Sequence, residues 1–183
     1  MLCTKNILYN FVKKKFVHTI YLSLGSNLNN RQENIFKAKV LIKKNIGIIT
    51  KESSIYLSEP WGYSSSNNFL NQCIAINTHL EPLELLRGLK KIETILGRKK
   101  QPNNIYIDRT IDIDILFYDN IYYKYLDILT IPHPLLHTRR FVLLPLVEIA
   151  PNFFHPLLNQ SISELLNKCK DKTLILNLDH INS

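Results

Sequence analysis

Two carboxylates lie two residues apart within a run that is otherwise apolar and β-branched. Asp112 and Asp114 alternate with Ile111, Ile113 and Ile115. Successive side chains of a strand point to opposite faces, so this spacing predicts both aspartates on one face and the isoleucines in a core. Paired like charges are unfavourable unless a cation neutralises them, and Mg²⁺ held by carboxylates and substrate phosphates does so. Taken alone, so short a motif favours two solvated carboxylates instead.

Basic residues on both sides of the aspartates change that balance. Arg98 and Lys100 lie upstream, Arg109 stands three residues before Asp112, and Arg139 follows downstream. Arginine forks match the geometry of phosphate oxygens, and lysine adds a point charge. The combination predicts a site for a triphosphate, whereas the simpler alternative is a basic surface with ordinary salt bridges.

These residues need a scaffold, and the apolar periodicity of the chain predicts one. Strands are predicted at 18–24, 46–57, 69–78 and 110–118, helices at 31–44, 82–96, 141–149 and 161–169, and a hairpin at 121–129. The helix at 141–149 is expected to be interrupted at Pro145, and Ser161 with Glu164 predicts a capping box. The order β-α-β-β-α-β predicts an α+β fold of the ferredoxin-like type: an antiparallel sheet with helices on one face, plus an added hairpin and C-terminal helices.

Length and composition are those of one soluble globular domain. The chain has 183 residues, of which 45% are hydrophobic and 21% are charged, and no apolar run reaches the roughly 18 residues that span a bilayer. Three cysteines without close spacing favour a reducing compartment over a disulfide framework, so the predicted location is the cytoplasm. The net charge of +8 comes largely from lysines scattered among isoleucine and asparagine, and it carries little weight for nucleic-acid or membrane binding.

The predicted domain spans residues 18–170, between an N-terminal extension at 1–17 and a C-terminal tail at 171–183. The extension lacks the arginine content of a transit peptide and the long apolar core of a secretory signal. It is therefore expected to be dispensable for activity.

Several sequence blocks occur in the order typical of one enzyme family. They are YLSLGSNL at 21–28, SEPWGY at 58–63, FLNQ at 69–72, IE at 92–93, GR at 97–98, RTIDID at 109–114, PHP at 132–134, RRF at 139–141 and PL at 145–146. On these blocks, which extend over about 19–169, the sequence resembles the 6-hydroxymethyl-7,8-dihydropterin pyrophosphokinases of folate biosynthesis. Each block is a weak signal by itself, and together they are a strong one.

The resemblance implies transfer of a diphosphate from ATP, the co-substrate, to a pterin alcohol, with release of AMP. It implies two Mg²⁺ ions held by Asp112 and Asp114, and it gives these aspartates, together with Arg98 and Arg109, catalytic roles. Four further residues would contact or lie near the nucleotide: Glu93, Lys100, His133 and Arg139. For His133, which lies between two prolines, a structural role is the alternative.

The pterin is a flat, polar heterocycle that needs ring stacking and hydrogen bonds at its edge. By resemblance, Phe69 and Phe141 are the stacking residues and Asn71 reads the edge, although aromatic residues at such positions otherwise belong to the core. The remaining wall of the pterin site would be formed by Ser58, Pro60, Trp61 and Gly62. The expected partners are ATP and the pterin, with no nucleic acid and no membrane, and the protein is expected to be a monomer.

The segment before Arg109 departs from the family pattern. A small pair such as Gly-Pro commonly precedes the arginine and a tryptophan lies slightly earlier, whereas this chain has Ile107, Asp108 and Tyr106. Without glycine the backbone loses access to positive φ, and Asp108 is expected to add negative charge close to the phosphates. The departure predicts altered kinetics more than lost function.

Three alternatives remain on the sequence alone. A ferredoxin-like RNA-binding module would expose aromatic residues in a Gly-Phe-containing motif, and the chain contains none. A metal-dependent nucleotidyl transferase or cyclase could carry the same aspartate pair, but it would not require Phe69, Asn71 and Phe141. The third alternative is an inactive homologue.

Overall fold

The computed structural model describes residues 17–98 and 107–178 of the chain. Lys100, the segment 99–106 and most of the predicted N-terminal extension lie outside these residues. The elements in chain order are β1 (His18–Ser26), α1 (Arg31–Asn45), β2 (Ile48–Glu52), β3 (Tyr56–Ser58), β4 (Phe69–Thr78), α2 (Pro82–Ile95), β5 (Asp112–Tyr118), β6 (Tyr123–Tyr125), β7 (Leu129–Ile131), a 3₁₀ turn (Leu136–Thr138), α3 (Arg140–Ile149), β8 (Phe154–His155), β9 (Gln160–Ser161), α4 (Ile162–Lys168) and β10 (Ile175–Asn177).

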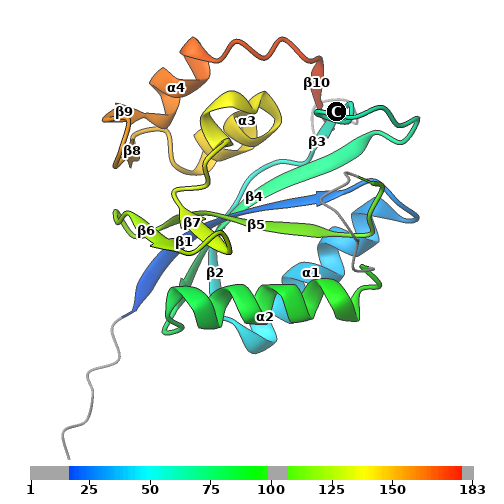
Figure 1. Cartoon of the computed structure of the whole chain (residues 1–183). Coiled ribbons are helices and arrows are strands. Elements are labelled where there is room, and N and C mark those ends of the chain that lie inside the picture. Colours follow the sequence, from blue (N-terminus) through cyan, green and yellow to red (C-terminus); the bar gives the residue numbers. More distant parts are fainter. Residues whose placement is uncertain (1–16, 99–106, 179–183) are drawn as a thin grey trace, which may run out of the picture.

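The central sheet has the strand order β10-β3-β4-β1-β5, and β2 also pairs with β4 (Figure 1). All its pairings are antiparallel. The register between the three long strands sets Gly25 of β1 opposite Asn71 of β4 and opposite Asp112 of β5, while Ser23 pairs with Asp114. Residues far apart in the sequence thus meet at one end of the sheet.

Each face of the sheet is covered by its own helices. In Figure 1, α1 and α2 lie on one side of the sheet, and α3 and α4 lie on the other. The α1/α2 core contains Ile20, Leu22, Leu24, Ile74, Ile76, Ile113 and Ile115, and the α3/α4 core contains Cys73, Ala75, Leu116 and Phe117. The sequence predicted a sheet with helices on one face and added C-terminal helices. In the structure these C-terminal helices, α3 and α4, cover the second face of the sheet.

Local sequence signals account for the helix ends. The predicted capping box is present at α4, where the Ser161 hydroxyl accepts the Glu164 backbone N–H and the Glu164 carboxylate accepts the Ser161 backbone N–H. A second capping box, with Pro82 in the first turn, begins α2, and Gly97 ends that helix region at a φ of +87°.

Three predicted element boundaries differ from the structure. The strand expected at 46–57 is split into β2 and β3; at the break the Ser53 backbone N–H still donates to the Cys73 carbonyl at 2.9 Å, but the Cys73 N–H donates to the Ser53 hydroxyl at 3.0 Å. The helix α3 continues through Pro145, whose ring costs only one intrahelical bond and suits a helical φ. Part of the segment expected to be a tail forms β10 and pairs with β3.

In the described part of the chain, no helix is both long enough and apolar enough to cross a membrane.

Candidate active site

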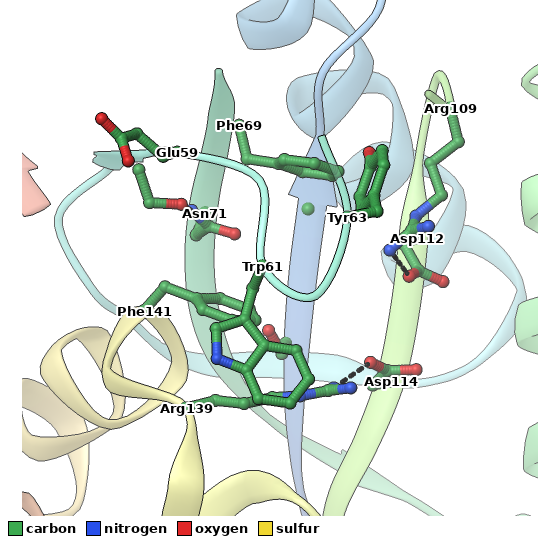
Figure 2. Close-up of a pocket in the computed structure, with 13 residues that line it drawn as sticks. Glu59, Trp61, Tyr63, Phe69, Asn71, Arg109, Asp112, Asp114, Arg139 and Phe141 are labelled. Atoms are coloured by element: carbon green, nitrogen blue, oxygen red, sulfur yellow. Dashed lines mark hydrogen bonds and ion pairs between the residues drawn. The ribbon is translucent and has the colours of Figure 1, made fainter. Parts of the chain in front are cut away.

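A cavity opens at the end of the sheet where β1, β4 and β5 meet, on the α3 face (Figure 2). It is lined by Ser23, Gly25, Ser58, Glu59, Trp61, Tyr63, Phe69, Asn71, Arg109, Asp112, Asp114, Arg139 and Phe141. Strand alternation explains its floor, because residues at 23 and 25 face away from the core that holds Leu22 and Leu24. A Cβ at Gly25 would lie 3.6 Å from the Asn71 amide oxygen, so glycine leaves this part of the floor open.

Asp112 is bound by two arginines. Arg109 Nη2 lies 2.8 Å from one carboxylate oxygen, and Arg98 Nη1 contacts the other. Burial by itself would raise the pKa of Asp112, but the charges of Arg109 and Arg98 outweigh it and hold this pKa below its usual value. Asp112 is therefore a compensated, ionised carboxylate.

Asp114 has weaker compensation, although it lies on the same face of β5. Its Oδ2 is 3.8 Å from Arg139 Nη1 and 3.9 Å from His133 Nε2, both beyond ordinary hydrogen-bond length. Burial and the neighbouring Asp112 charge raise the pKa of Asp114. This carboxylate therefore favours a proton or an added cation.

Glu93 lies beneath the aspartates and not in the cavity lining. Its carboxylate accepts hydrogen bonds from Arg98 at 2.7 Å, from Lys90 at 2.9 Å and from the Ile113 backbone N–H at 2.8 Å, and its side chain is 3% exposed. Burial raises its pKa. Glu93 thus joins α2 to β5 and orients Arg98 toward Asp112.

His133 also stands behind the lining residues. Its Nδ1 accepts the Leu135 backbone N–H at 3.1 Å, so the proton of the neutral ring resides on Nε2, which faces Asp114. Burial lowers the pKa of His133, which opposes the effect of the Asp114 charge. The ring can donate from Nε2 at neutral pH.

Aromatic side chains form the wall opposite the aspartates. Trp61 and Phe141 approach with ring centroids 6.4 Å apart, and the Arg139 guanidinium lies 4.8 Å from the Trp61 centroid. On the other side of the cavity, Tyr63 meets Phe69 edge-on at 6.5 Å. Figure 2 shows Phe69 and Phe141 on separate sides of the opening, with Trp61 in front. A flat ring system fits between such surfaces.

Asn71 is oriented for recognition at the cavity edge. Its amide nitrogen donates to the Ser58 hydroxyl at 2.9 Å and to the Tyr56 carbonyl at 3.4 Å. The residue is 2% exposed, so these bonds fix its side chain. The amide oxygen is left on the Gly25 side of the floor.

With this geometry established, the chain can be compared with known proteins. Residues 21–151 match the family described as 7,8-dihydro-6-hydroxymethylpterin-pyrophosphokinase. The chain belongs to this family. The resemblance seen in the sequence blocks is thereby confirmed, and membership makes the protein an enzyme of the pyrophosphokinase class.

Individual relatives support the family assignment. The chain is 40% identical over 146 residues to the 2-amino-4-hydroxy-6-hydroxymethyldihydropteridine pyrophosphokinase of Aquifex aeolicus, which covers 80% of this chain and 89% of the relative. It is 41% identical over 140 residues to a folic acid synthesis protein of Dictyostelium discoideum, which covers 76% of this chain but 21% of that protein. A crystal structure of Plasmodium falciparum HPPK-DHPS matches with a TM-score of 0.71 at 20% identity, over 86% of this chain and 45% of that chain, and shows the likeness of fold.

The pyrophosphokinase fold brings most of the predicted site residues to one cavity. Those that line it are Ser58, Trp61, Phe69, Asn71, Arg109, Asp112, Asp114, Arg139 and Phe141. Arg98, Glu93 and His133 stand behind them, Pro60 and Gly62 flank Trp61 without lining the cavity, and Lys100 is outside the described residues. The individual roles of these residues remain predictions.

Sequence reasoning missed several residues of the site. Ser23, Gly25, Glu59 and Tyr63 line the cavity, and Asn27 binds the Arg109 backbone. Alternation along β1 could have found Ser23, because it is polar between two core leucines. The contact of Asn27 joins positions 82 apart, and no local pattern reveals it.

Proposed function

We propose that this protein transfers a diphosphate from ATP to 6-hydroxymethyl-7,8-dihydropterin and releases AMP. The observation that carries the proposal is one cavity in which an arginine-bound aspartate pair faces an aromatic wall with a fixed amide at its edge. Family membership supports the same reaction.

The proposed pterin position is between Phe69 and Phe141, with Asn71 at the polar edge of the ring. Hydrogen bonds to Ser58 and Tyr56 orient Asn71 from within the protein, so little ordering entropy is lost on binding. Trp61 and Ser58 complete the wall on the same side. This arrangement would aim the hydroxymethyl group at Asp112 and Asp114.

The proposed phosphate position is next to Arg109, Arg98 and Arg139. In the apo protein Arg109 and Arg98 are paired with Asp112, so phosphate oxygens would compete for donors that are already gathered in one place. The hydroxymethyl oxygen would attack the β-phosphorus, and the bond to the α-phosphate oxygen would break in line. Glu93 would act by orienting Arg98, and His133, whose Nε2 faces Asp114, would contact the nucleotide phosphates.

The two aspartates fit Mg²⁺, and we propose two ions there. Asp114 is a buried carboxylate with incomplete compensation, and oxygen donors suit this ion. Within residues 17–98 and 107–178 no cluster of three or more His, Cys, Asp or Glu side chains is gathered for a metal, so phosphate and water oxygens would complete the coordination. When bound, the metal would screen phosphate charge and make the hydroxyl a better nucleophile.

Other features are proposed at the level of the whole chain. The order β5-β1-β4 with β2 and β3 beyond it, and α1 and α2 on one face, supports a ferredoxin-like classification. We also propose a cytoplasmic monomer with a dispensable segment at 1–17 and a domain that begins at 18 and extends past 170 to include β10.

Product identity tests the reaction. The protein is incubated with Mg²⁺, ATP and the pterin alcohol, and nucleotides are separated by chromatography. AMP and a pterin diphosphate are expected in equal amounts. ADP as the product would indicate an ordinary kinase, and AMP formed without pterin would indicate hydrolysis, so either result would overturn the proposal.

A further inference from the structure

Asp108, the residue that departs from the family pattern, is a meeting point for two segments of the chain. Its Oδ1 accepts hydrogen bonds from the Asn27 amide at 2.6 Å and from the Tyr63 hydroxyl at 3.2 Å. Its Oδ2 accepts from the Ser65 hydroxyl at 3.0 Å and from the Asn67 amide at 2.5 Å. The carboxylate that was expected to add negative charge close to the phosphates thus also accepts hydrogen bonds from four neutral donors.

The donors come from both sides of the cavity entrance. Asn27 follows β1, whereas Tyr63, Ser65 and Asn67 belong to the loop at 59–68 between β3 and β4. That loop carries Trp61 and Tyr63 into the cavity wall. The carboxylate therefore joins the start of the β5 region to the loop that forms much of the proposed pterin wall.

Arg109 has separate supports. Its backbone N–H donates to the Asn27 amide oxygen at 2.7 Å, and its carbonyl accepts the Asn27 backbone N–H at 3.2 Å. Its guanidinium binds Asp112 and lies 5.3 Å from the centroid of Phe69. Loss of the Asp108 carboxylate would leave these contacts of Arg109 in place.

Near its middle the loop is also contacted by the Asn27 amide, which donates to the Tyr63 hydroxyl at 3.2 Å and to the Asn67 carbonyl at 3.4 Å as well as to Asp108. Asn67 donates its backbone N–H to Ser65 within the loop, and the loop's end is held by Arg31, which donates to the Asn68 carbonyl at 2.7 Å. Tyr63 packs edge-on against Phe69, and both rings line the cavity, as Figure 2 shows. The hydrogen bonds to Asp108 thus help to hold Tyr63, and the part of the loop around it, next to Phe69, the expected stacking residue.

We propose that Asp108 is a positioning residue for the pterin: it binds the 59–68 loop so that Tyr63 and Trp61 are set around the ring before substrate arrives. This inference rests on the proposed function for its substrate and goes beyond it in the residue and the mechanism. Four charge-assisted hydrogen bonds to one carboxylate suit such a role, because a single acceptor group then holds several side chains of the loop. The positioning acts on substrate binding more than on the chemical step.

Steady-state kinetics of Asp108→Ala and Asp108→Asn test the proposal. Asp108→Ala is expected to raise the pterin KM about tenfold or more, while kcat and the ATP KM change by less than about threefold. The pterin KM of Asp108→Asn should lie between those of the wild type and Asp108→Ala, because asparagine keeps one acceptor oxygen but presents an amide group to the Asn67 donor. The control is Asp127→Asn, which removes the same charge from an exposed position between β6 and β7 and should match the wild type.

A swapped pair separates positioning from general damage. Asn67→Asp alone places a second carboxylate next to Asp108 and should raise the pterin KM. The double variant Asn67→Asp with Asp108→Asn again pairs a donor with an acceptor and should recover part of that loss. Damage unrelated to this contact predicts additive losses and no such recovery. An unchanged pterin KM in Asp108→Ala, or equal losses for ATP and pterin, would overturn the proposal.

A measurement without substrate keeps this proposal distinguishable from the proposed function. Trp61 is the single tryptophan of the chain and lies in the loop. Its emission maximum and anisotropy should change in Asp108→Ala and return toward wild type in the swapped pair. If the wild type released no AMP, the proposed reaction would fail, and the Trp61 signal would still decide whether Asp108 holds the loop.

Discussion

Asp112 and Asp114 carry the same side chain on the same face of β5, yet neutralising them should change stability in opposite directions. The pKa of Asp112 is lowered by Arg109 and Arg98, so its ionised form stabilises the folded state. The pKa of Asp114 is raised by burial and by Asp112, so its ionised form destabilises the folded state. Asparagine removes each charge and nearly preserves the shape.

The magnitudes follow from the contacts. Asp114→Asn relieves a like-charge pair on adjacent sites of one face and should stabilise the apo protein by about 1 kcal/mol. Asp112→Asn removes the carboxylate that Arg109 and Arg98 share, although Arg98 keeps Glu93, and it should destabilise by about 1–3 kcal/mol after allowance for solvent. For a chain of this length each kcal/mol corresponds to about 2–4 °C in Tm.

Thermal unfolding of the apo proteins in low salt checks the signs, and the AMP-release assay checks activity. Asp114→Asn should melt above the wild type and Asp112→Asn below it, while both lose turnover by orders of magnitude. Addition of Mg²⁺ and ATP should raise the wild-type Tm and should raise the Asp114→Asn Tm much less. Tm shifts of the same sign in the two variants would refute the assignment of a compensated and an uncompensated carboxylate.

Three further outcomes are expected. Phe141→Ala should weaken pterin binding by about 1–3 kcal/mol with little effect on ATP binding, as measured by calorimetric titration, and equal weakening of both would contradict the stacking role. Ser161→Ala should lower the free energy of unfolding by about 0.5–2 kcal/mol, because the Glu164 backbone N–H loses its cap; urea denaturation measures it, and no change would mean that the cap does not stabilise α4. The pKa of Asp171 is lowered by hydrogen bonds from Thr173 and from the Arg140 N–H, so its contribution to stability is present above the unfolded value of 3.8 and is lost as pH falls through the lower folded value. Asp171→Asn should therefore be destabilising at pH 7, and the difference should shrink as the pH falls below 3.8; a pH-independent difference would exclude this source.

The chain's local patterns were sufficient for most of the elements that carry the site. Alternation around Ile113 identified β5 and the shared face of the aspartates, and the apolar run at 69–78 matches β4. The Ser161 capping box was likewise readable, because a cap depends on residues three apart. These features arise from strand and helix periods, which short-range sequence expresses directly.

The functions of Glu93 and Asp108 were not readable in this way. Glu93 is buried under β5, where it meets Arg98 and the Ile113 N–H, and its expected place near the nucleotide stays a prediction. Asp108 was expected to add negative charge close to the phosphates, and the contacts of its carboxylate with Asn27 and the loop at 59–68 were not foreseen. In both cases the partner group lies on another element.

The sequence by itself determined the residue types of the site, their places on strands and loops, and the family that the ordered blocks resemble. Only the tertiary structure decided which carboxylate is compensated, which residues line the cavity and which stand behind them. The physical reason is that charge compensation and hydrogen bonding depend on distances of about 3–4 Å between side chains. The register of β1 with β4 and β5 creates those distances, and it joins positions far apart in the sequence, such as Gly25 with Asn71, 46 residues away, and Ser23 with Asp114, 91 residues away.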